Sequence, residues 1–241
     1  MSLNVAKIKN SGGNNRVEQP VLEVGAYPAR VVQVLDLGVQ NPRPYQGQPK
    51  PPKHCISVTY ELLDAFMVDE NGNELEDKPR WVSEDFPLNS LDSDLAKSTK
   101  RYMAIDPELA FGGDFTLLVG QPCMVTTVNR DVGDKTYTNV AGVNPMRARD
   151  AARAPELVNP PKVFVLDNPD MEVFLSLPEF LQERIKSNLN YQGSVLQKMV
   201  DGDYVKEKVE SVRKEEPEEQ EEDSGAVGVE QQEEFDEDAP W

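Results

Sequence analysis

Five strand-like segments, with one helical segment between the third and the fourth, constrain the fold of this 241-residue chain more than any other feature. The strand-like segments have two-residue periodicity or are rich in β-branched and aromatic residues. They are residues 25–36, 54–66, 80–86, 122–128 and 135–143. Asn71-Gly72 predicts a hairpin between the second and third segments, and residues 130–134 join the last two. A helix is expected from Ser90 to about Met103, followed by a short helical turn at residues 115–120.

This order of elements is the layout of the OB-fold, a small Greek-key barrel. OB-folds bind single strands on one face and with the loops that join strands 1–2 and 4–5. Here these loops are residues 41–53 and 130–134. The first contains five prolines, which exclude both a helix and a central strand. We therefore predict a mainly β protein, a five-stranded OB-fold barrel with a helix between strands 3 and 4.

The remaining segments suggest appendages to this barrel. Residues 144–161 form a connector rich in Pro, Ala and Arg, and residues 162–166 are a further candidate strand. Residues 177–189 carry an apolar stripe that predicts a C-terminal packing helix. We divide the chain into a flexible N-terminal arm (1–20), a domain (21–194), a charged linker (195–214) and a disordered acidic tail (215–241).

The net charge of -18 is concentrated at the C-terminal end. Residues 215–241 contain 13 acidic and no basic residues, which leaves 30 acidic and 25 basic residues in the first 214. The body is thus almost balanced, and an acidic whole-chain charge does not exclude a nucleic-acid binder.

Residue types that support catalysis are scarce, and we expect that the protein is not an enzyme and binds no cofactor or metal ion. There is one histidine, His54, and Cys55 and Cys123 lie too far apart for a zinc motif. No glycine-rich phosphate-binding motif is present. The two cysteines are expected to be reduced thiols, with a single bridge as the alternative. No segment reaches the apolar length of a signal peptide core or a membrane span.

Basic and aromatic residues cluster in a way that favours nucleic-acid binding. No acidic residue lies between Asp36 and Glu61, and loop 41–53 adds cations and a tyrosine there. Single-strand binders combine cations for phosphates with aromatic faces on which bases stack. The predicted DNA-binding residues are Arg30, Arg43, Tyr45, Lys50, Lys53, Tyr60, Trp81, Lys100, Arg101, Arg130 and Tyr137. Tyr60 and Trp81 could instead belong to the hydrophobic core. Lys100 and Arg101, on the predicted helix, could instead belong to a solvated face that binds nothing. A further cluster, Arg147, Arg149 and Arg153, has the alternative of a simple linker.

The chain ends in Glu-Glu-Phe-Asp-Glu-Asp-Ala-Pro-Trp, residues 233–241. This end resembles the acidic tip of bacterial and phage single-stranded DNA-binding proteins, with Trp241 where Phe is usual. The body is similar to the phage proteins in residues 25–38, in the basic loop and in residues 168–194. The resemblance implies an OB-fold and sequence-independent binding of single-stranded DNA in phage replication and recombination. It places the protein in the cytoplasm of the infected bacterial host, without a membrane partner.

The tail has a physical rationale beside the resemblance. A tethered polyanion competes with DNA for the same cations, and DNA that displaces it frees the tip for phage or host replication and recombination proteins. The predicted partner-binding residues are Phe235, Asp236, Glu237, Asp238, Pro240 and Trp241. For the tail, the alternative is a segment that only increases solubility. For the whole protein, the alternatives are a phage transcription cofactor that recruits RNA polymerase, with DNA binding secondary, and an acidic DNA mimic that inhibits a host nuclease.

Overall fold

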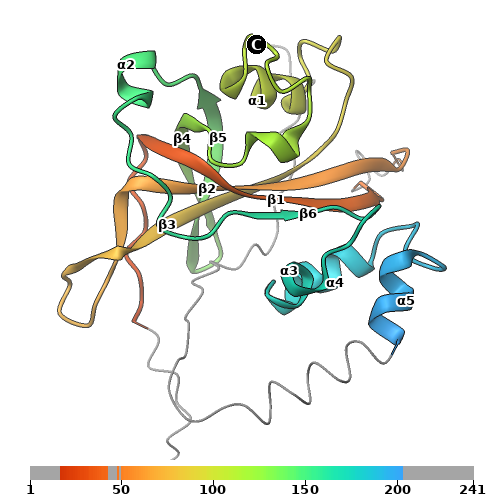
Figure 1. Ribbon diagram of the computed structural model, residues 1–241. Coiled ribbons are helices and arrows are strands. Elements are labelled where there is room, and N and C mark those ends of the chain that lie inside the picture. The colour runs from red at the N-terminus through yellow and green to blue at the C-terminus, as the bar shows by residue number, and fades with distance from the viewer. Residues whose placement is uncertain (1–16, 43–47, 49, 203–241) are drawn as a thin grey trace, which may run out of the picture.

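Five antiparallel strands form a nearly closed barrel in the computed structural model, which describes residues 17–42, 48 and 50–202 (Figure 1). The strands are β1 (Ala26–Gln40), β2 (Lys53–Val68), β3 (Glu74–Pro87), β4 (Pro122–Val132) and β5 (Lys135–Asn144). They lie in the order β3-β2-β1-β4-β5, and β3 also contacts β5 across the remaining opening. The predicted mainly β, OB-type barrel is confirmed.

The strands are longer, and the turns tighter, than the sequence pattern indicates. β2 begins at Lys53, which pairs with Gln40 of β1, so Lys53 lies on a strand and outside the predicted loop. β4 continues to Val132, and only Gly133 and Asp134 separate it from β5. Gly133 has φ +60°, a conformation that tight two-residue hairpin turns require.

Helix α1 (Lys97–Ile105) lies between β3 and β4, as predicted, but it begins several residues after Ser90. Ser90 forms a local side-chain turn instead, because its hydroxyl bonds the carboxylate and the backbone N–H of Asp92. The short turn η2 (Phe115–Leu118) follows, and the Asp114 carboxylate caps it by accepting from the backbone N–H of Thr116. The two elements pack beside the barrel and carry the chain from β3 to β4.

The C-terminal part forms a layer on the outside of the barrel (Figure 1). Its elements are β6 (Lys162–Phe164), α3 (Met171–Leu175), α4 (Glu179–Lys186) and α5 (Val195–Asp201), whereas α2 (Ala148–Ala151) lies apart from them, near α1. β6 runs parallel to β1, and α4 occupies the centre of the predicted packing helix. Leu196 of α5 is buried in this layer, so the folded body extends past residue 194.

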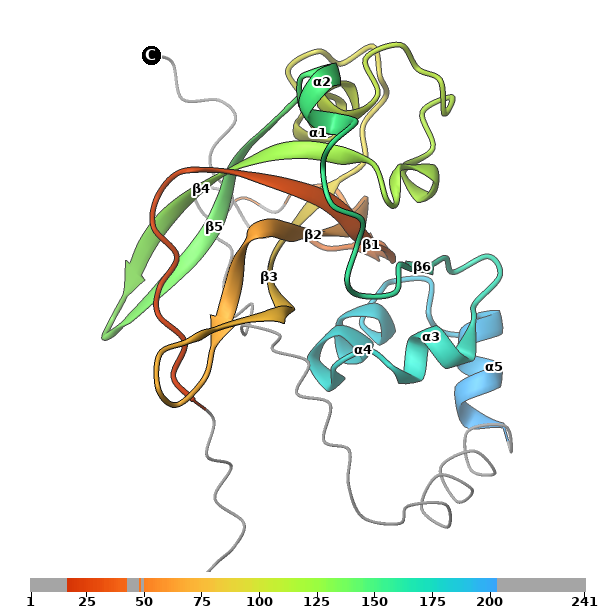
Figure 2. The ribbon, with the colours of Figure 1, turned by 60° about the vertical axis from the view of Figure 1, so that its left-hand side comes forward.

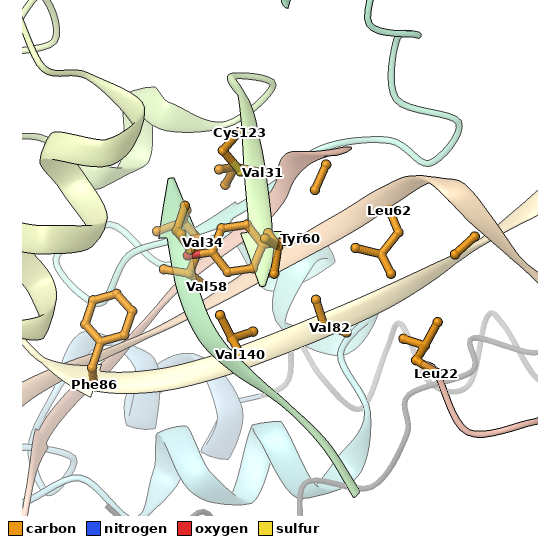
Figure 3. Close-up of a cluster of buried hydrophobic side chains, with 14 of the residues drawn as sticks. Leu22, Val31, Val34, Val58, Tyr60, Leu62, Val82, Phe86, Cys123 and Val140 are labelled. Atoms are coloured by element: carbon orange, nitrogen blue, oxygen red, sulfur yellow. The ribbon is translucent and has the colours of Figure 1, made fainter. Parts of the chain in front are cut away.

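Strand β1 is buried on both faces and therefore contributes to two cores. Figure 3 shows the barrel core, where Val31 and Val34 meet Val58, Tyr60 and Cys123. The second core lies between β1 and the C-terminal layer. Its buried members are Leu35, Leu37, Phe164, Met171, Phe174, Leu177, Ile185 and Leu196. Cys55 and Cys123 are thiols that are not joined by a disulfide. None of the helices in the described ranges is long and apolar enough to cross a membrane.

Candidate nucleic-acid interface

The outer face of the β4–β5 hairpin brings together cations and an aromatic ring. Arg130 pairs directly with Tyr137. Two residues further along, toward the turn, Val132 pairs with Lys135 on the same face. Val128 pairs with Asn139 one step closer to the barrel. Residues directly opposite on antiparallel strands share a face, and so do residues two apart. We call these six residues, Val128, Arg130, Val132, Lys135, Tyr137 and Asn139, the hairpin face.

The opposite side of the same hairpin identifies the hairpin face as the outer one. Thr127 and Val140 are buried and pair with each other, and Asn129 bonds Thr138 on the same side. A bulge between Thr126 and Thr127 changes the alternation just before this point. Figure 2 shows the hairpin extending from the barrel on the side away from α3–α5.

The hairpin face carries positive charge without a carboxylate among its six members. Asp131 lies on the inner side, where its carboxylate accepts a hydrogen bond from the Thr136 hydroxyl at 2.6 Å. Val128 and Val132 are exposed, and Tyr137 is half-buried. Two cations, a tyrosine ring and exposed apolar groups side by side match what a single strand requires, since phosphates need cations and bases need flat apolar surface.

Arg30, a predicted DNA-binding residue, serves instead as an internal clamp. Its guanidinium donates to the carbonyl oxygens of Gly120, Ala154 and Pro155, and it approaches the Glu156 carboxylate at 3.4 Å. All the neutral acceptors are backbone groups of loops that pass over β1. All three guanidinium nitrogens donate within the protein, so the structure places Arg30 in an internal contact and not on the hairpin face.

Tyr60 and Arg101 are also drawn into the interior, around the buried carboxylate of Glu84. Arg101 donates to both carboxylate oxygens at 2.8 and 3.2 Å, and the Tyr60 hydroxyl donates at 2.9 Å. Lys97 completes the cluster at 3.1 Å. Burial, and then Glu84, raises the pKa of Tyr60 well above its ordinary value, which keeps the phenol a donor. The structure thus places Tyr60 and Arg101 in the interior, where the cluster around Glu84 anchors α1 to the barrel.

Trp81 lies on the outer face of β3, half-buried beside a second buried carboxylate, that of Glu61. The indole N–H donates to Glu61 at 3.1 Å. The backbone N–H groups of Val158 and Asn159, and the Asn159 side chain, donate to the same carboxylate. The connector thus covers the outer surface of β2 around Glu61.

Lys50, Lys53 and Lys100 are exposed, and Lys53 lies away from the hairpin face. Lys53 pairs with Gln40 at one end of β1, whereas Ala26 at the other end pairs with Thr126 at the base of the hairpin. A 15-residue strand is about 50 Å long. The two predicted loops therefore lie at opposite ends of β1, and the predicted residues do not form one surface.

Some predicted residues lie outside the described part of the chain: Arg43, Tyr45, Phe235, Asp236, Glu237, Asp238, Pro240 and Trp241. Sequence reasoning also missed members of the hairpin face, namely Val128, Val132 and Asn139. The alternation in residues 128–132 and 135–139 contains this signal, since it places Asp131, the one acid of the two segments, on the other side of the hairpin.

No family model matches this chain, and no curated protein matches it significantly. Within the described ranges, no group of three or more His, Cys, Asp or Glu side chains is arranged to hold a metal ion. The hairpin face is therefore judged by its own geometry.

Proposed function

We propose that this chain binds single-stranded DNA without sequence preference, and that the hairpin face is its principal contact. The observation that carries the proposal is the direct cross-strand pairing of Arg130 with Tyr137, next to Lys135. A base that stacks on the tyrosine ring leaves its flanking phosphates within reach of cations on both sides.

The barrel supports this assignment because OB-folds are a common scaffold for single-strand binding. The fold alone does not determine function, so the argument depends on the face. Three exposed cations follow β5 in the chain, Arg147, Arg149 and Arg153. They add positive charge near the end of the hairpin that joins the barrel.

A salt titration of labelled oligo-dT tests the proposal. Log affinity should fall linearly with log salt, and duplex DNA should bind much more weakly. Arg130→Ala should reduce the slope of this line by about 0.7, the value for one phosphate contact on a single strand. Lys78→Ala is the matched control, because it removes an exposed cation from β3, outside the face.

The tyrosine gives a second, independent test. Tyr137→Ala should weaken binding by about 1–3 kcal/mol, while Tyr137→Phe keeps the ring and should bind nearly as well as the original chain. Equal binding of duplex and single strand, or wild-type affinity in both alanine variants, would contradict the proposal.

We further propose that binding serves DNA replication and recombination of a phage in its bacterial host, and that residues 235–241 recruit partner proteins. Support comes from the acidic, aromatic-ended sequence. Removing residues 215–241 changes the net charge from -18 to -5 and should tighten oligo-dT binding, most at low salt. Removing Trp241 alone should leave DNA affinity unchanged and abolish capture of replication proteins.

A further inference from the structure

A pocket of about 310 Å³ lies beside the start of β2, at the end of β1 farthest from the hairpin face. Its apolar walls come from β1 and β2, from β6, and from the loops on either side of α1. They are Val34, Ile56, Leu88, Leu91, Phe115 and Phe164. The Phe115 ring is half-buried and contacts the rings of Phe86, in a tilted arrangement, and of Tyr102, edge to face, at centroid distances of 5.8 and 5.2 Å.

The polar groups of the pocket are few and fixed. His54 Nε2 lies 2.6 Å from Asp36 Oδ1, and the imidazole is 48% exposed. Asp36 also accepts from the backbone N–H groups of Gly38 and Leu166. Asp114 accepts from both the N–H and the hydroxyl of Thr116. Both carboxylates are thus occupied by donors of the protein.

Positive charge lies at the mouth of this pocket. Lys53 is exposed and precedes His54 on β2, and its ammonium group lies 3.5 Å from the side-chain oxygen of Asn89, which lines the pocket. The carboxylates of Asp36 and Asp114 would repel a phosphate inside, while Lys53 would attract one outside. The pocket therefore suits a ligand with a flat, neutral head and an anionic end.

We propose that this pocket binds one unstacked nucleobase of a single strand, with the adjoining phosphate held by Lys53. The proposal rests on the proposed function and adds a second contact to it. Ligand pockets usually measure about 300–1,000 Å³, so a pocket of this volume suits a group as small as one nucleoside. Phe115 and the aliphatic walls supply the flat apolar surface that a base needs.

His54 provides the measurement, because it is the only histidine in the chain. Its imidazole carbon-bound protons give one resolved pair of NMR signals from the full-length protein. Thymidine 5′-monophosphate should shift them in a saturable way, with half-saturation in the millimolar range, because a single nucleotide makes few contacts. Inorganic phosphate and a peptide of residues 236–241 serve as comparison ligands.

Two matched substitutions locate the effect. Leu91→Trp enlarges a side chain of the pocket wall and should weaken nucleotide binding at least about tenfold. Leu95→Trp makes the same change four residues away, at a side chain that is 78% exposed and outside the pocket, and should have no effect. Urea denaturation of both variants verifies that each is folded.

A saturable shift with the nucleotide, lost in Leu91→Trp and kept in Leu95→Trp, would support the proposal. An equal shift with phosphate alone, a shift only with the peptide, or no shift would overturn it. Oligo-dT binding through Arg130 and Tyr137 is measured separately, so failure of the pocket leaves the proposed function standing. Loss of oligo-dT binding with the nucleotide shift retained would reject only the proposed function.

Discussion

Replacing Arg101 with alanine tests whether this residue belongs to the core or to a DNA-binding surface. The Arg101 side chain is 9% exposed and the Glu84 side chain 1%. Removing one partner of a buried ion pair costs about 3–5 kcal/mol, because the other charge stays buried. Lys97 and Tyr60 still contact Glu84, so we expect a loss near the lower limit, about 3 kcal/mol.

Urea denaturation, followed by tryptophan fluorescence and far-ultraviolet circular dichroism, measures this loss. Lys100→Ala is the matched control, because Lys100 is the exposed neighbour of Arg101 on the same helix. Its effect on the free energy of unfolding should stay within about 0.5 kcal/mol. For a folded body of this size, a 3 kcal/mol loss lowers Tm by about 6–12 °C.

A double variant strengthens the test. Arg101→Met combined with Glu84→Gln removes both charges and should recover much of the stability lost in Arg101→Ala, since a neutral pair carries no buried charge. The reasoning would be refuted by an Arg101→Ala protein as stable as Lys100→Ala that had nevertheless lost affinity for oligo-dT.

Three further predictions concern single positions. Burial raises the pKa of Cys123 to about 12, so at pH 8 iodoacetamide should modify Cys55 first and reach Cys123 only after unfolding, as peptide mass spectrometry would reveal. Burial also raises the pKa of Asp85. Its ionised form is therefore disfavoured in the folded state, and Asp85→Asn should increase the free energy of unfolding at pH 7. Near pH 3 the substitution should have no such effect, because the carboxyl group is protonated in both the folded and the unfolded state. Urea titrations at the two pH values measure this, and a larger stabilisation at pH 3 than at pH 7 would contradict it. Gly38 has φ +71°, and an added Cβ would lie 2.7 Å from the Leu166 side chain. Gly38→Ala should therefore lower the free energy of unfolding by about 1–3 kcal/mol in the same urea assay. An unchanged midpoint of urea denaturation would count against the close packing.

The barrel could be predicted from the sequence because its signals are local. Alternation within each strand, Asn71-Gly72 and the loop at residues 130–134 act over a few residues. That Arg130 and Tyr137 flank the loop between the last two strands could be predicted for the same reason, whereas their exact pairing follows from the tighter turn at residues 133–134.

The roles of buried charged residues could not be predicted, because their partners are distant in the chain. Arg30 bonds carbonyl groups 90 to 125 residues away, and Glu61 accepts from groups 97 and 98 residues away. Composition shows only that such residues are usually exposed. Pairings of this kind depend on how the connector crosses the sheet, which periodicity does not encode.

The burial of β1 on both faces has a consequence for synthesis of the chain. The barrel strands are complete once residue 144 has been made, but Leu35 and Leu37 are covered only by segments after residue 162. Chains grow at about 5–20 residues per second, so a nascent barrel carries an apolar stripe for at least a few seconds. During that interval neighbouring nascent chains can associate through the stripe. This association ends when the last helices of the body fold onto β1 and cover Leu35 and Leu37.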